Sequence, residues 1–186
     1  DSRGESFTAR VLQQRHGYAD FGQVFFLVRE GLPIEQGDNL SSHRFERTRQ
    51  FYGNVFEYMG KLADPMAFIA NVLAGRHHRS FRDRSYRDYV KSNKSSRPMY
   101  FQLNAPLIGI YQEYNNKLRN ASHHGSIRYD DANRVVSFPS SVGSKTIIDM
   151  SYAEYIACCC RMFLQFTCFM LVDMEMNPLL LDRHQA

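Results

Sequence analysis

The segment that most constrains the fold of this 186-residue chain is the apolar helix predicted at residues 151–176. Ser151 and Glu154 have the spacing of a capping box, in which two side chains bind unpaired backbone N–H groups at the start of a helix. Apolar residues then surround nearly the whole helix, which is typical of a helix at the centre of a bundle. We expect it to end at Asn177 and Pro178, because proline cannot continue the helical hydrogen bonds.

The most apolar part of this helix, residues 155–172, is about as long as a membrane span. Arg161 and Gln165 lie inside it, and an arginine at the centre of a bilayer costs about 2.5–3.5 kcal/mol. A buried core helix is therefore favoured over a membrane span. Residues 1–14 are polar and lack the apolar stretch of a signal peptide, so we expect a cytoplasmic protein without a membrane partner.

The same helix carries three successive cysteines, Cys158, Cys159 and Cys160, out of four in the chain. Neighbouring helical residues point about 100° apart, so three in a row cannot converge on one metal ion. Four cysteines are also too few for a disulfide scaffold. We interpret the three as small buried apolar residues in a protein of a reducing compartment, and we expect neither a metal site nor a cofactor.

Periodicity and turn signals outline the rest of the chain. We expect helices over residues 42–62, from Asp64-Pro65 to Gly75, and over residues 105–122 with a stop at Gly125. Residues 127–138 predict a β-hairpin around the turn at 130–133. The fold is therefore mainly α, a bundle of four to five helices with a small β-hairpin inserted before the last core helix. Residues 1–40 form an N-terminal arm or extension, where residues 21–28 fit a buried strand or a short helix equally well.

The end of the third predicted helix carries the candidate motif. Arg119 is followed at once by the polar Asn120 and then, five positions after the Arg, by His124. This arrangement resembles the signature of the HEPN superfamily, an Arg and a His separated by four to six residues, with a polar residue directly after the Arg. The motif also lies on a long helix before the last core helix, as it does in that family of helical bundles. The resemblance implies a HEPN-like helical domain at residues 41–186.

Members with this motif are often metal-independent endoribonucleases, and the residue chemistry fits that activity. Single-stranded RNA supplies its own nucleophile, the 2′-OH group, and the expected product is a 2′,3′-cyclic phosphate. A histidine with an ordinary pKa of about 6.5 accepts or returns a proton at neutral pH, the role expected of His124. Arg119 stays protonated and offers forked donors to phosphate oxygens. Asn120 would orient the histidine or hold a phosphate oxygen.

Helix geometry leaves a second histidine as an alternative base. Residues five apart differ by about 140° around a helix, whereas His123, four residues after Arg119, lies on the same face. His124 can join Arg119 if the helix ends or bends near Gly125, or if a second chain supplies the partner motif. HEPN ribonucleases usually pair two motifs across a dimer, so the resemblance implies a homodimer with a composite active site.

The modest net charge of +4 hides a basic segment at residues 76–97, which contains eight Arg or Lys residues and two Asp residues. Phe81, Tyr86 and Tyr89 are interleaved with the basic residues. Such a segment could follow an RNA backbone and stack bases, or it could be a solvated loop. The residues that we assign to RNA binding are Arg79, Arg82, Arg84, Tyr86, Arg87 and Lys91.

The resemblance also implies a role in prokaryotic defence, as part of an abortive-infection system, a toxin–antitoxin pair or a CRISPR-associated effector. An antitoxin or a sensor domain would then lie outside this chain, and a chain that begins with Asp1 fits the effector end of a larger protein. Two alternatives stay open. One is a non-catalytic HEPN-like module for RNA binding, nucleotide binding or dimerisation, and the other is an unrelated helical interaction domain in which the motif is coincidental.

Overall fold

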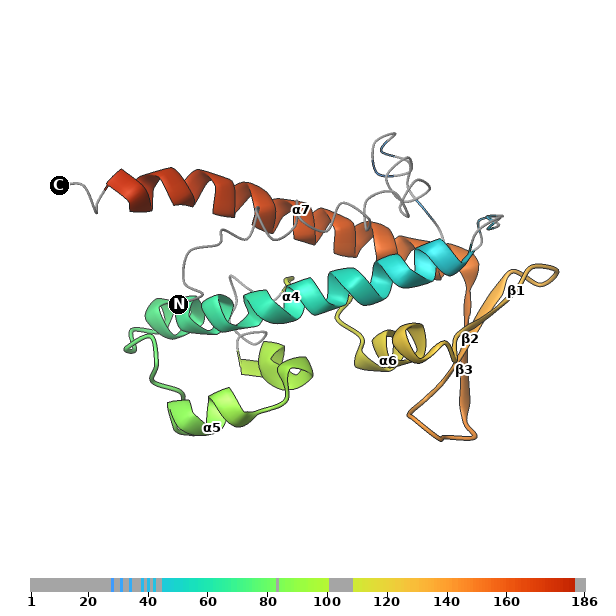
Figure 1. Cartoon of the computed structure of the whole chain (residues 1–186), viewed down its shortest axis with the longest axis horizontal. Helices are drawn as coiled ribbons and strands as arrows, with labels where there is room; N and C mark the ends of the chain where they lie inside the picture. The colour runs from blue at the N-terminus through green and yellow to red at the C-terminus, as the bar shows by residue number, and fades with distance from the viewer. Residues whose placement is uncertain are drawn as a thin grey trace.

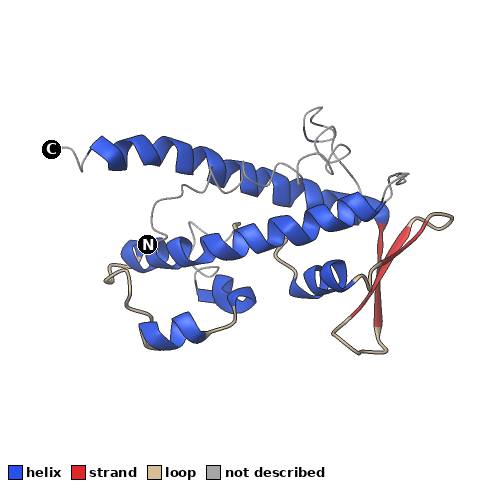
Figure 2. Cartoon of the chain, viewed as in Figure 1, coloured by secondary structure: helices blue, strands red, loops and turns tan. Residues whose placement is uncertain are grey.

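The computed structural model describes residues 45–82, 84–100 and 109–182. Within these ranges, the side chains of residue 94 and of residues 172–182 are not described. Single positions are also described at Val28, Gly31, Ile34, Asp38, Leu40 and Ser42, so most of the predicted arm at 1–40 lies outside the described residues. The described chain is mainly helical, as predicted, with one small sheet (Figure 2).

Two long helices, α4 (Phe45–Leu73) and α7 (Tyr152–Asp182), pack along one another and form the body of the domain (Figure 1). On the other side of α4 lie α5 (Tyr86–Lys91), the 3-10 helix η1 (Lys94–Tyr100) and α6 (Asn116–His124). The helix α4 is therefore the central element, in contact with α7, η1 and α6. The core between α4 and α7 is rich in aromatic rings, including the fully buried Tyr52 and Tyr155.

The two helices predicted on either side of Asp64-Pro65 are one continuous helix of 29 residues, so the predicted new start there is wrong. Asp64 does not cap a helix; its carboxylate accepts hydrogen bonds from Arg97 and Tyr89 instead. Pro65 has no N–H to donate to the carbonyl of Lys61, so one helical hydrogen bond is missing. Lys61 is exposed, and water can bind this carbonyl instead. The predicted stop is confirmed, because Gly75 lies after the helix with a φ of +70° and its N–H binds the carbonyl of Val72.

The predicted start of α7 is confirmed, because the N–H of Glu154 donates to the Ser151 hydroxyl at 3.1 Å. The predicted end is wrong, since α7 continues through Asn177 and Pro178 to Asp182. Its first half packs on α4, and the prediction of three buried cysteines is confirmed for Cys159 and Cys160, whereas Cys158 is half-buried. By length and hydropathy the stretch Tyr152–Leu171 could also cross a membrane, although 44% of it is buried within this fold.

The predicted hairpin is confirmed as β1 (Arg128–Asp130) and β2 (Val135–Pro139), which pair antiparallel with Asp130 opposite Val135. A third strand, β3 (Ile147–Ser151), extends it to a sheet of order β1-β2-β3. The last residue of β3, Ser151, is also the cap of α7. The sheet therefore lies at the end of the long helices where α7 begins (Figure 1).

The helix predicted at residues 105–122 is shorter than expected. Residues 101–108 are outside the described part, residues 109–113 form turns, and α6 begins only at Asn116. Tertiary contacts explain the late start: the Tyr111 hydroxyl donates to the Met59 carbonyl while Tyr111 adopts a φ of +69°. The Asn115 side chain then caps α6, and Gly125 ends it with a φ of +66°, as predicted for that glycine.

Candidate functional site

The candidate motif lies where α6 meets α4, at a place where α4 has two glycines. A Cβ added at Gly53 would lie 3.2 Å from Nε2 of His123, and one added at Gly60 would lie 2.6 Å from the Tyr114 hydroxyl oxygen. The Tyr114 ring also stacks on Phe56 of α4, with 3.6 Å between ring centroids and 5° between planes. The absence of side chains at these positions lets the α6 segment approach α4 closely.

Arg119 is held by a carboxylate of α4. Its Nε donates to Oε1 of Glu57 at 2.6 Å, and its Nη2 donates to the same oxygen. Its Nη1 donates to the Oδ1 of Asn120 at 2.8 Å. The Arg119 side chain is 30% exposed and that of Glu57 43%, so the ion pair is within reach of water and of a ligand. The structure thus brings Arg119 and Asn120 together, as the motif requires, and adds Glu57 to them.

The two histidines of the motif differ in position. Nε2 of His123 lies 3.8 Å from Oε1 of Glu57, so His123 shares a carboxylate with Arg119. His124 is exposed in the last turn of α6, and its side chain makes no hydrogen bond or ion pair to any residue that the structure describes. The four-residue spacing therefore places His123, the alternative base, beside Arg119, as helix geometry predicts. Within one copy of the chain, His124 is not in this cluster.

A cavity of about 250 Å³ opens beside Arg119, between α4, η1 and α6. Polar side chains make up most of its wall, and Phe56 and Tyr114 contribute aromatic surface. Its lining residues are Phe56, Glu57, Gly60, Asn93, Ser95, Tyr114, Asn116, Arg119 and Asn120. Burial raises the pKa of Tyr114 above its usual range, so this phenol stays protonated.

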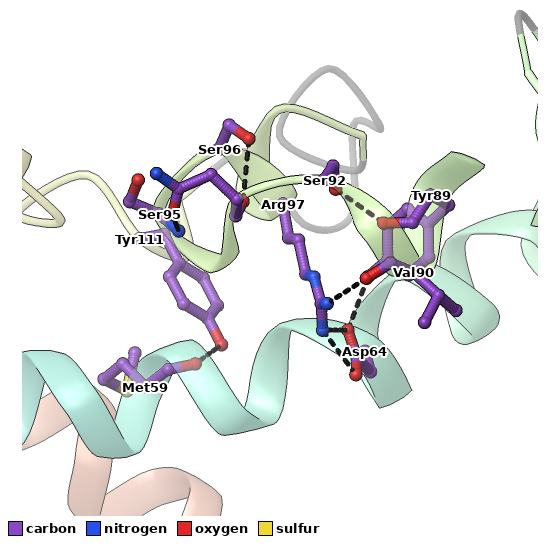
Figure 3. A network of polar contacts seen from close by, with 10 residues as sticks. Met59, Asp64, Tyr89, Val90, Ser92, Ser95, Ser96, Arg97 and Tyr111 are labelled. Carbon is purple, nitrogen blue, oxygen red and sulfur yellow. Dashed lines mark hydrogen bonds and ion pairs between the residues drawn. The ribbon is translucent and has the colours of Figure 1, made fainter. Parts of the chain in front are cut away.

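The basic segment is fixed to α4 by an internal network (Figure 3). Arg97 has a 9%-exposed side chain, and its Nη1 donates to both oxygens of Asp64 at 2.7 and 2.8 Å. Its Nη2 donates to the Val90 carbonyl, and the Tyr89 hydroxyl donates to Asp64. Tyr89 is fully buried and stacks on Phe81, so the expectation that Tyr89 could stack on a base is wrong. Its ring belongs to the core.

The six residues assigned to RNA binding are all exposed, on the segment that leads to and forms α5: Arg79, Arg82, Arg84, Tyr86, Arg87 and Lys91. The Arg79 guanidinium lies 5.0 Å from the centre of the Tyr86 ring, and the Arg84 guanidinium lies 4.5 Å from that of Tyr100. These contacts hold two of the cations beside aromatic faces while leaving them open to solvent. The segment is thus a positively charged surface with defined structure.

Sequence reasoning missed Glu57, Asn93 and Asn116. Glu57 had a detectable signal: it stands between the apolar Phe56 and Tyr58, with a glycine four residues before it and another three residues after it. A lone carboxylate among apolar residues on a helical face with two glycines indicates a close-packed polar contact. Asn93 and Asn116 had no such signal, because their meeting depends on the packing of η1 and α6 on α4.

In the part of the chain that the structure describes, no group of three or more His, Cys, Asp or Glu side chains could hold a metal ion. The groups that meet at the site are the guanidinium of Arg119, the carboxylate of Glu57, the imidazole of His123 and several side-chain amides. No protein-family model, curated protein or solved structure matches the chain.

Proposed function

We propose that this chain is a HEPN-like, metal-independent endoribonuclease that cuts single-stranded RNA. The observation that carries the proposal is the direct contact of Arg119 with Asn120 on the wall of a polar cavity, with His123 sharing the same carboxylate. We further propose that it acts as a homodimer in the cytoplasm, as the effector of a prokaryotic defence or toxin system. The exposed cations of residues 79–91 would attract the RNA backbone.

In the proposed reaction the ribose 2′-oxygen attacks the adjacent phosphorus, and the bond from phosphorus to the 5′-oxygen breaks. The products are a 2′,3′-cyclic phosphate and a free 5′-hydroxyl, and one proton moves from the 2′-OH to the leaving oxygen. A histidine takes and returns this proton. Arg119 stabilises the charge that grows on the phosphoryl oxygens. Asn120 orients the Arg119 guanidinium by accepting a hydrogen bond from it.

The two histidines have different places in this scheme. His123 is the base available within one copy of the chain, because it lies beside the same carboxylate as Arg119. His124 is exposed at the end of α6, where it is accessible to a second copy. In a dimer with a composite site, His124 of one copy would act on RNA held by Arg119 of the other.

A second candidate function is a non-catalytic module that binds RNA or a nucleotide. The observation that favours it is the engagement of Arg119, whose Nε and Nη2 both donate to Glu57 in this conformation. A phosphate can still reach the remaining N–H bonds of the guanidinium, which has five donors. Binding alone needs no base, so the separation of His124 from Arg119 is no obstacle to it.

The test is cleavage of a 5′-labelled single-stranded RNA in EDTA, with detection of a terminal 2′,3′-cyclic phosphate. We expect the wild type to cleave. The single variant Arg119→Ala should lose activity, and so should His123→Ala or His124→Ala, whichever histidine is the base. The control Arg128→Ala, at an exposed position of β1, should keep it. Full activity in all of the motif variants would refute the proposed site. No cleavage, with RNA binding that depends on Arg119, would identify the binding module instead.

A mixing experiment tests the composite site. Arg119→Ala and His124→Ala proteins are combined after each has been shown to be inactive. If the active site joins two chains, heterodimers contain one intact pairing, and partial activity returns. Continued inactivity, in a mixture that forms dimers by light scattering, would place the whole site within one chain.

A further inference from the structure

We infer that the cavity beside Arg119 is a base-binding subsite, which takes one unpaired nucleobase of the RNA next to the phosphate that Arg119 holds. This inference rests on the proposed function, since it names what the same site recognises. The volume of about 250 Å³ lies just below the about 300–1,000 Å³ of pockets for drug-sized ligands. The cavity is therefore suited to a single ring system rather than to a larger molecule.

The charges around the cavity favour an uncharged occupant. One cation and one anion line it, Arg119 and Glu57, and they are already paired with each other. A second phosphate would meet the Glu57 carboxylate without an additional cation to balance it. A nucleobase is polar but neutral at pH 7, so it fits this lining better than a phosphate does.

Three side-chain amides supply the hydrogen-bonding groups that a base edge needs. The Asn116 amide makes no hydrogen bond to another described residue. Asn93 uses its Oδ1 to accept the N–H of Ser95, and Asn120 uses its Oδ1 to accept Arg119, so both retain NH₂ donors. Side-chain amides pair with base edges because each offers a donor and an acceptor on one plane.

The aromatic surface that a base can contact comes from the half-buried Tyr114, because Phe56 is only 2% exposed. Tyr114 lines the cavity with its ring stacked on Phe56, and the Arg119 guanidinium lies 5.9 Å from the centre of that Phe56 ring. Proteins that read single-stranded RNA hold splayed-out bases against aromatic rings or arginine planes while they bind the base edge. The cavity combines both kinds of surface with an amide-lined wall.

The position of the cavity along the chain agrees with a path for RNA. Asn93 and Ser95 line it and lie only two and four residues after Lys91, the last of the six exposed residues assigned to RNA binding. RNA bound electrostatically at Lys91 would thus lie close to the cavity wall. The phosphate adjoining the inserted base would then lie at Arg119.

The test uses a probe that cannot be cut, so that binding is separate from catalysis. Single-stranded hexamers of each base with 2′-O-methyl ribose lack the nucleophile, and their affinities are measured by fluorescence anisotropy. We expect the wild type to discriminate among the four, and Asn93→Ala and Asn116→Ala each to lower this discrimination about 2- to 10-fold. The control is Asn54→Ala, an exposed asparagine of α4 that does not line the cavity.

Unchanged discrimination in Asn93→Ala and Asn116→Ala, with thermal unfolding like that of the wild type, would overturn the inference. If RNA cleavage persists in that case, the proposed function stands and only the base subsite is lost. If the hexamers are discriminated but no RNA is cut, the subsite stands and the catalytic proposal falls. A nucleoside 5′-monophosphate that competes as well as a hexamer identifies a free nucleotide as the occupant, which also overturns the RNA subsite.

Discussion

Replacing Glu57 with glutamine would show how strongly its carboxylate restrains Arg119. Glutamine keeps the shape and one acceptor oxygen of Glu57 but removes the negative charge. The paired side chains are 30% and 43% exposed, and solvated ion pairs of this kind contribute about 0.2–1 kcal/mol. We therefore expect the free energy of unfolding to fall by up to about 1 kcal/mol, which lowers Tm by about 2–4 °C or less in a chain of this size.

The same substitution should strengthen RNA binding. The Glu57 carboxylate competes with an RNA phosphate for the Nε and Nη2 donors of Arg119. Without this competition, the free energy of RNA binding should become more favourable by up to the energy of the ion pair. A gain of up to about 1 kcal/mol corresponds to an affinity increase of up to about 5-fold, measured with a 2′-O-methyl hexamer. In an Arg119→Ala background the gain should vanish, because the double-mutant cycle then contains no interaction to release.

Glu46→Gln is the matched control, because it removes one negative charge from the same helix. Glu46 pairs with Arg49, is 59% exposed and does not line the cavity. Equal affinity gains in the two variants would show that net charge alone is responsible. Weaker RNA binding in Glu57→Gln would refute the reasoning outright, since the carboxylate would then be a part of the binding site rather than a competitor.

Three further outcomes are expected in unfolding and labelling assays. Gly60→Ala should cost about 1–2 kcal/mol, because a Cβ would lie 2.6 Å from a ring hydroxyl, whereas Gly109→Ala meets nothing within 4 Å and should be neutral. Arg97→Ala should cost about 1.5–3 kcal/mol in chemical denaturation, because it removes a 9%-exposed side chain with its charged hydrogen bonds to Asp64, although Asp64 is 39% exposed and keeps the hydrogen bond from Tyr89. At pH 8 a thiol reagent should label only the exposed Cys168 in the native chain and all four cysteines after unfolding, since burial raises the pKa of the thiols at 158–160 and keeps them neutral.

Local signals were sufficient for those parts of the fold that depend on neighbouring residues. The Ser151 cap of α7 and the turn between β1 and β2 are confirmed, because each depends on side chains within three residues that bind the backbone. Pro65 was misread as a helix start, because the partner of Asp64 is Arg97, 33 residues away. Local sequence could not reveal that pairing.

The candidate site was only half predictable for the same reason. Arg119, Asn120 and the rival histidines are adjacent in sequence, so their common position on α6 could be inferred from helix geometry alone. Glu57 is 62 residues before Arg119, and the amides of Asn93 and Asn116 come from different elements. These residues meet only because α4 packs against both η1 and α6.

The helix α4 holds two arginines from later parts of the chain, through Glu57 for Arg119 and Asp64 for Arg97. The two carboxylates are seven residues apart, which on a helix is about 10 Å along the axis and only about 20° in angle. Deleting one residue between them would turn one carboxylate by about 100° relative to the other, and inserting seven would restore the angle but double the spacing. Changes of length in α4 that keep both ion pairs are therefore confined to positions before 57 or after 64.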